Sequence, residues 1–121
     1  LLLAVIERHA GLRFSDRDVF VNVAGGIRLD EPAADLAAAV ALASSLLGRP
    51  VAPDAALFGE VGLSGEIRAV SAARLRAREA AKFGFTRCIL PGNCAREAAG
   101  TGAVPEPAVK LKDALRIALE T

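Results

Sequence analysis

The sequence contains no tryptophan, tyrosine or methionine, and its 121 residues include only five phenylalanines, two cysteines and one histidine. Without large aromatic side chains, the core has to be built from alanine, valine, leucine and isoleucine, which favours close approach of the backbones. Two cysteines, Cys88 and Cys94, are too few for a disulfide framework or a zinc site. We therefore predict two ordinary thiols and no metal centre.

An excess of charge of either sign is also absent, because 15 basic residues stand against 14 acidic ones. Together with a hydrophobic fraction of 53%, this balance excludes a disordered chain. The length fits one domain, which we place over residues 1–121. A net charge of +1 neither favours nor excludes nucleic acid as a partner, because the distribution of charge matters more than its sum.

Long hydrophobic runs are missing as well. The most apolar stretch, residues 33–47, is shorter than the roughly 20 residues of a membrane span and contains Asp35. It predicts a largely buried helix, in which Ala38→Lys or Ala41→Lys should destabilise the fold. The apolar residues 1–6 follow no basic stretch and do not fit a secretory signal. We expect a cytoplasmic protein, and the start in a mid-helix pattern, without an initiator methionine, predicts an excised domain.

Apolar periodicity and turn residues divide the chain into helices and strands. Strands are expected over residues 18–24, 55–61, 66–70 and 87–90, with a hairpin turn at 63–65. Helices are expected before Gly11 and over residues 33–47, 73–83 and 113–119, and Asp30 is expected to cap the second of them. A helical turn is expected at 94–99 and a loop at 100–107. Strands mixed with helices, including a hairpin, indicate an α/β or α+β fold with a mixed β-sheet.

Two stretches of the chain resemble a known family. The first runs from Asp30-Glu31-Pro32-Ala33-Ala34-Asp35 to Gly48-Arg49-Pro50-Val51, and the second comprises residues 59–68 together with 79–85. They resemble Lon-type protease domains, and more closely the C-terminal domain of the RadA family, also called Sms. Residues 18–26 are similar to the same family, and the match runs without gaps from about residue 17 to 91. The resemblance implies a Lon-protease-like fold, also described as ribosomal-protein domain-2-like.

The resemblance also implies that the protease site is vacated. Lon proteases carry a serine nucleophile in the motif Asp-Gly-Pro-Ser-Ala-Gly and a lysine base on a later helix. Ala33 occupies the serine position, Glu31 the first motif glycine and Arg76 the lysine position. A methyl group cannot attack a carbonyl, and a guanidinium, with a pKa above about 12, cannot act as general base near neutral pH. We therefore expect no catalytic residue and no enzyme activity in this domain.

A relocated nucleophile is not indicated either. No remaining serine has a base and an acid at a readable spacing, so structural positions are predicted for Ser44, Ser45, Ser64 and Ser71, and a helix-end cation for His9. Glu60 and Glu66 flank the expected hairpin and are interpreted as solvated or register-setting charges. A Gly-x-x-x-x-Gly-Lys phosphate loop is also missing, so we expect no ATP and no other cofactor in this domain.

Basic charge is concentrated in one segment. Residues 66–87 contain six basic residues against two acidic ones. Arg74, Arg78 and Lys82 are spaced four residues apart, which places them in one stripe along the expected helix, opposite a face of alanines.

Two interpretations of this stripe remain open. It is either a solvated helix face that happens to be basic, or a set of sequence-independent, salt-sensitive contacts to DNA phosphates. Arg68 and Arg76 are further candidate DNA contacts. Arg76, expected at the edge of the packed face, is also a candidate for an internal salt bridge, which we favour over a DNA contact.

The RadA resemblance implies a parent protein to which such a domain belongs. This parent is an ATP-dependent motor for branch migration in recombinational DNA repair, with zinc-binding and ATPase domains upstream. It forms a homohexameric ring whose Lon-like domains build a positively charged platform. The implied partners are single- and double-stranded DNA, further copies of the chain and recombination proteins of the RecA type, with no membrane. ATP, magnesium and zinc are implied as cofactors of the parent.

Two rival hypotheses are kept. One is an active serine protease of the Lon family, against which the substitutions at Ala33 and Arg76 count. The other is a Lon-like domain of a different parent, such as the magnesium-chelatase-like competence proteins, or a ribosomal-type RNA-binding domain of the same superfold. Fold analogy alone is a weak warrant for function, so the motif match carries the assignment.

We expect the purified chain to leave unfolded protein substrates intact, because neither a nucleophile nor a base stands at the dyad positions. Restoring the nucleophile alone, with Ala33→Ser, should not produce cleavage, since Arg76 cannot accept the proton. The measurement is peptide release compared with a mock preparation. Cleavage above that background that a serine-directed inhibitor abolishes would contradict the assignment.

Overall fold

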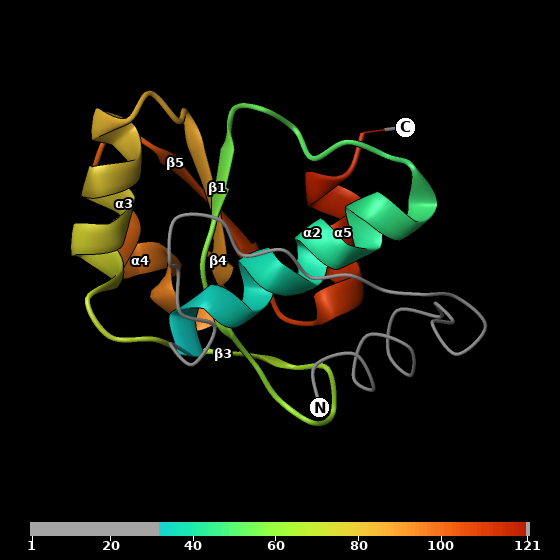
Figure 1. Cartoon of the computed structure of the whole chain (residues 1–121). Coiled ribbons are helices and arrows are strands. Elements are labelled where there is room, and N and C mark those ends of the chain that lie inside the picture. The colour runs from blue at the N-terminus through green and yellow to red at the C-terminus, as the bar shows by residue number, and fades with distance from the viewer. Residues whose placement is uncertain (1–31, 121) are drawn as a thin grey trace.

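The computed structural model describes residues 32–120 (Figure 1). Its helices and strands, in chain order, are α2 (Asp35–Leu47), β1 (Ala55–Leu57), β2 (Glu60–Val61), β3 (Ile67–Arg68), α3 (Ala73–Lys82), β4 (Arg87–Pro91), α4 (Ala95–Ala98), β5 (Val104–Ala108) and α5 (Leu111–Ala118). Short 3-10 turns, η2 (Pro32–Ala34) and η3 (Gly92–Cys94), precede α2 and α4. The helix predicted before Gly11, the strand predicted over 18–24 and the predicted cap Asp30 lie outside the described residues.

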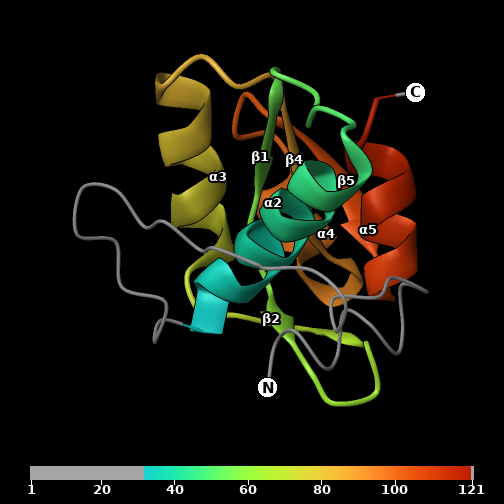
Figure 2. The ribbon, with the colours of Figure 1, turned by 45° about the vertical axis from the view of Figure 1, so that its right-hand side comes forward.

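A three-stranded parallel sheet forms the centre of the fold, in the order β1-β4-β5. The strands β2 and β3 form a separate antiparallel pair at the predicted hairpin. Helices α2 and α5 lie on one face of the parallel sheet, and α3 and α4 on the other (Figures 1 and 2). The predicted α/β (α+β) class is confirmed, with parallel and antiparallel pairing in two separate sheets.

Both faces of the parallel sheet are buried, as is usual for parallel strands. Successive residues of β4 alternate between the faces: Ile89 packs with residues of α2 and α5, whereas Cys88 and Leu90 pack with residues of α3 and α4. Alanine is the most frequent residue in both clusters. The small side chains let the helices lie close to the sheet, as the lack of aromatic residues predicts.

The helix α2 is fully buried on one face only, so the prediction of a largely buried helix is wrong for its outer face. Its buried side chains, Leu36, Ala39, Val40 and Ala43, follow the spacing of a single helix face. Ala41 is exposed and Ala38 is half-buried. Because alanine also fills the outer face, the hydrophobicity of the sequence did not reveal which side of the helix faces solvent.

The strand predicted over residues 55–61 is divided at Gly59 into β1 and β2. The Gly59 N–H donates to the Ala33 carbonyl at 3.0 Å, and the Gly59 carbonyl accepts the Leu36 N–H at 2.9 Å. A Cβ at Gly59 would lie 2.9 Å from Cγ2 of Ile67, closer than carbon atoms can pack. The backbone therefore leaves the parallel sheet at Gly59 to meet the start of α2.

The segment predicted as a loop over 100–107 contains the strand β5, which corrects that prediction. The strand contains Pro105 and Pro107, and proline has no N–H to donate to a neighbouring strand. The Val104 N–H donates to the Thr86 carbonyl at 2.8 Å, so the backbone N–H and C=O groups of the even-numbered residues of β5 point toward β4. The backbone nitrogens of both prolines consequently point away from β4, to the side on which no strand of residues 32–120 pairs with β5, so the ladder needs no N–H from them.

Lysine substitutions in α2 should separate its two faces. Ala39→Lys places a charge at a fully buried position and is expected to lower the free energy of unfolding by about 3 kcal/mol or more. Ala41→Lys, at an exposed position of the same helix, should change it by less than about 0.5 kcal/mol. Urea unfolding monitored by circular dichroism measures both; equal losses of stability would contradict the packing of α2.

Candidate functional site

The two predicted dyad positions lie on either side of the segment 58–59. Ala33, in the turn η2, is 4% exposed, and its carbonyl accepts the Gly59 N–H. Arg76, in α3, lines a groove together with Phe58, and its Nε donates to the Ser71 carbonyl at 2.9 Å. Arg76 is half-buried, which agrees with its predicted place at the edge of the packed face.

Two of the remaining serines hold turns of the backbone. The Ser44 hydroxyl donates to the Arg49 carbonyl at 2.5 Å, just beyond the end of α2. The Ser64 N–H donates to a Glu66 carboxylate oxygen at 3.0 Å. Ser45 is exposed, and His9 lies outside the described residues. The hydroxyl contact agrees with the structural position predicted for Ser44, whereas the Ser64 contact involves only its backbone.

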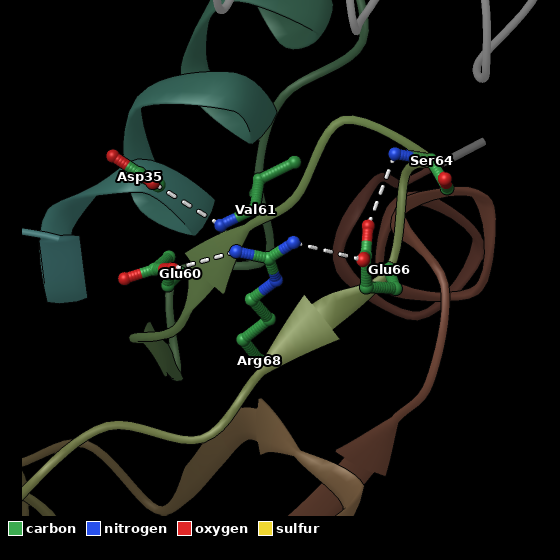
Figure 3. Close-up of polar contacts among 6 residues, drawn as sticks. All are labelled: Asp35, Glu60, Val61, Ser64, Glu66 and Arg68. Atoms are coloured by element: carbon green, nitrogen blue, oxygen red, sulfur yellow. Dashed lines mark hydrogen bonds and ion pairs between the residues drawn. The ribbon is translucent and has the colours of Figure 1, made fainter.

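Asp35, at the start of α2, fastens this helix to the hairpin. Its Oδ2 accepts the Val61 N–H at 3.1 Å (Figure 3). Burial raises the pKa of the Asp35 carboxyl, the hydrogen bond from Val61 opposes the rise, and the negative charge of Glu60 adds to it. The carboxyl is therefore held nearer to its protonated form than an exposed aspartate.

Arg68 lies between two carboxylates of the hairpin. Its guanidinium is 3.4 Å from Oε1 of Glu60 and 3.3 Å from Oε2 of Glu66 (Figure 3). The pKa of the Glu66 carboxyl is lowered, mainly by a hydrogen bond from its own backbone N–H and further by Ser64 and Arg68. Burial has a smaller, opposite effect. Glu60 thus pairs with Arg68 across the hairpin, in keeping with a register-setting charge, whereas Glu66 pairs with Arg68 from two residues earlier on the same side. The candidate DNA contact Arg68 is already compensated by two negative charges.

The predicted stripe is present as an exposed ridge on α3, which we call the basic ridge: Arg74, Arg78 and Lys82. The opposite face of the helix is buried through alanines, as predicted. The Arg74 guanidinium donates to the Ala99 carbonyl at 3.1 Å, and Lys82 pairs with Glu79 at 3.3 Å. Within residues 32–120, Arg78 is exposed and its side chain forms no hydrogen bond or ion pair.

The sixth basic residue of this segment, Arg87, is structural. It is bonded to Asp54 and Glu106, each at 3.2 Å, and its side chain is 22% exposed. It thus links the loop before β1 to β5, across β4. Arg68 is exposed as well but is paired with Glu60 and Glu66, so the basic ridge holds most of the exposed basic charge of residues 66–87.

A groove of about 510 Å³ lies beside the basic ridge and was missed from the sequence. It is bounded by α3, by the end of β1 and by the segment after α3, and it is lined by Leu75, Arg76, Glu79, Phe58, Phe83 and Phe85, among others. The signal that could have found it is the placement of two of the five phenylalanines directly after the basic helix.

The described residues offer no grouping of three histidine, cysteine, aspartate or glutamate side chains that could hold a metal ion. Cys88 and Cys94 are buried and unbridged, and burial raises the pKa of the Cys88 thiol, which disfavours the reactive thiolate. None of the helices between residues 32 and 120 is long and apolar enough to cross a bilayer.

The sequence pattern of the family described as "Subunit ChlI of Mg-chelatase" matches residues 3–93. The chain belongs to this family. It is also similar to proteins named DNA repair protein RadA: 49% identical to those of Escherichia coli and Salmonella typhimurium, and 51% to that of Haemophilus influenzae, over 97% of the chain. The predicted resemblance to RadA is confirmed. The chain spans about a quarter of the length of these relatives, so it matches a segment of RadA.

Asp35→Asn and Glu66→Gln should change the pH dependence of stability in opposite directions. A carboxyl with a raised pKa stabilises the fold at low pH, and this contribution is lost as the pH rises through its folded pKa. The wild type should therefore lose stability as the pH rises above 3.8, the ordinary pKa of an aspartate. Asp35→Asn keeps an acceptor for the Val61 N–H and should not show this loss. The pKa of Glu66 is lowered, so its carboxylate stabilises the fold above the ordinary pKa of 4.5, and this stabilisation disappears as the pH falls through the folded pKa. Glu66→Gln should therefore lack this pH-dependent stabilisation.

The dependence of the free energy of unfolding on pH is measured by urea unfolding of both variants and the wild type from about pH 3 to pH 7, at constant ionic strength. Asp35→Asn should gain relative to the wild type as the pH rises, and Glu66→Gln should lose. A change of the same sign for both variants would contradict the environments of the two carboxyls.

Proposed function

We propose that this chain is a non-proteolytic, Lon-like domain of a DNA-repair ATPase of the RadA type, and that it binds DNA without regard to sequence. The name and the extent of the similar proteins support the repair context, since about half of the residues are identical over nearly the whole chain. The position of Arg78 carries the part of the proposal that concerns DNA.

Arg78 is the centre of the basic ridge and is exposed, and within the described chain no carboxylate neutralises it. An uncompensated cation flanked by two further cations one turn away on each side is suited to consecutive phosphates. The Arg74 guanidinium is held by backbone carbonyls, which do not cancel its charge, while the nearby Glu97 carboxylate accepts the Arg74 backbone N–H at 3.2 Å. Lys82 is weakly compensated, because its pair with Glu79 is highly exposed.

The absence of proteolysis is proposed from the same two positions on which the sequence prediction rests. Ala33 presents a buried methyl group, and Arg76 presents a guanidinium whose Nε is already bonded to a backbone carbonyl. Neither group can supply a nucleophile or a general base at neutral pH. The domain would therefore have kept the position of a protease site and lost its chemistry.

The remaining properties of the parent are proposed on the similarity to RadA alone. They are a homohexameric ring to which this domain contributes contacts, an ATPase that uses ATP and magnesium, a zinc-binding domain, RecA-type partners and a cytoplasmic location. A second candidate is a Lon-like domain of a magnesium-chelatase-like competence protein. The match of residues 3–93 to the ChlI family favours this candidate, whereas the similarity over 97% of the chain favours RadA.

Removal of two ridge charges should weaken DNA binding in a way that depends on salt. For Arg78→Ala/Lys82→Ala we expect lower affinity for all DNA sequences alike, and a slope of log K against log salt that is smaller by about two, since each cation that no longer meets a phosphate reduces it by about one. Labelled single- and double-stranded oligonucleotides are titrated at several salt concentrations by fluorescence anisotropy. The full-length protein is preferred, because a ring multiplies weak contacts.

The matched control is Lys112→Ala/Arg116→Ala, which removes two exposed cations from α5 instead of α3. This variant changes the net charge by the same amount and should keep the salt slope of the wild type. An unchanged slope for the ridge variant, with the fold and the oligomeric state intact, would make the ridge a solvated surface.

A further inference from the structure

The scarce aromatic residues of this chain converge on one place. Phe58, Phe83 and Phe85, which are all the phenylalanines of residues 32–120, line the groove beside α3. We propose that this groove takes an unpaired nucleobase of single-stranded DNA, stacked on Phe83, while the strand's phosphates lie along the basic ridge. This inference rests on the proposed function and specifies which form of DNA the interface favours.

The spacing along α3 brings the groove and the ridge together. With about 3.6 residues per turn, Arg74, Arg78 and Lys82 follow one line on the helix surface, and Leu75, Glu79 and Phe83 follow the next. The second line faces the groove, because all three of its residues line it. A DNA backbone held by the ridge therefore has its bases within reach of the groove, a single line of side chains away.

The three phenylalanines differ in how they are held. Phe58 is 7% exposed and belongs to the buried core, so it forms the floor of the groove. Phe85 is half-buried and packs against the same core, and its N–H donates to the Ala80 carbonyl at 3.1 Å. Phe83, at the end of α3, is 80% exposed. Leu75, two turns away on the same line of α3, is 59% exposed, so the outer wall of the groove has exposed apolar side chains on either side of Glu79.

A nucleobase fits this combination of charge and surface. Bases stack on exposed aromatic side chains, and a positively charged track beside them holds the backbone; this is the usual construction of single-strand binding surfaces. Every base has a stacking face, so such a site does not select a sequence. The volume of about 510 Å³ lies within the range of roughly 300–1,000 Å³ that encloses small organic ligands. In duplex DNA the bases are stacked on one another and cannot enter.

The polar residues of the groove suit the edge of a base. Glu79 lines the groove and can accept hydrogen bonds from the exocyclic amino groups of a base. Glu79 also repels phosphate, which keeps the backbone on the ridge and directs the bases toward the apolar side. An uncharged apolar partner would gain nothing from the ridge, so the charge favours nucleic acid as the occupant.

The test replaces Phe83, whose exposure makes its side chain dispensable for folding. Phe83→Leu keeps an apolar side chain but removes the stacking face, and should lower the affinity for single-stranded oligonucleotides by about tenfold. The affinity for duplex and the salt slope on both forms should not change, because the cations that meet the phosphates stay in place. Val109→Ala, at an apolar position that is 63% exposed on another part of the surface, is the control and should leave all three quantities unchanged.

Phe83→Trp gives a direct readout of stacking. The sequence contains no tryptophan, so the new indole is the only one in the chain. Its emission should be quenched when single-stranded oligonucleotide is added and should stay constant with duplex. The affinity of this variant for single strands should equal or exceed that of the wild type, because indole stacks at least as well as phenyl.

The outcomes separate this inference from the proposed function. If the ridge variant Arg78→Ala/Lys82→Ala binds all DNA like the wild type, the proposed function fails and the inference with it. If the ridge variant is weakened but Phe83→Leu keeps the wild-type ratio of single-strand to duplex affinity, only the inference is overturned. If Phe83→Leu keeps that ratio and lowers the apparent mass in size-exclusion chromatography, the groove is a protein interface and the inference is equally overturned.

Discussion

The backbone hydrogen bonds around Gly59 constrain most of what surrounds the candidate site. They join this residue to Ala33 and Leu36, while the Phe58 N–H donates to the Ile89 carbonyl at 3.1 Å, so the start of α2, the end of β1 and the centre of β4 meet within two residues. The crossing leaves no space for a side chain at Gly59. It also fixes Phe58, the floor of the groove, and Ala33, the predicted nucleophile position, so both depend on the same backbone hydrogen bonds.

The secondary structure could be predicted wherever a pattern had one physical cause. The hairpin at 63–65 and the helix from Ala73 followed from turn residues and from the alternation of alanine with charge. The prediction failed where two causes compete: alanine on both faces concealed the exposed side of α2, and prolines concealed β5 because their orientation depends on the neighbouring strand. For the groove, the two phenylalanines after α3 are a signal of one side only, because the other side brings in Phe58 from the end of β1, which is distant in the sequence.

The arginines of residues 66–87 illustrate why a count of charges says little about a binding surface. Arg68 is paired with two glutamates, Arg87 links two carboxylates across the sheet, and Arg76 turns toward a backbone carbonyl. The same guanidinium group thus fixes the strand register at Arg68, links the sheet to a loop at Arg87 and bonds to the backbone at Arg76. Only the cations of the ridge are directed outward by the helix geometry, and this selection required knowledge of which carboxylates are near in space.

The two prolines of β5 have a consequence for how copies of this domain can meet. An added strand needs donors on the sheet edge, and Pro105 and Pro107 remove two successive donors from the outer side of β5. A neighbouring chain therefore cannot extend the sheet there by backbone pairing. Contacts at this edge would have to be made by side chains, which single substitutions can strengthen, weaken or redirect without disturbing the sheet itself.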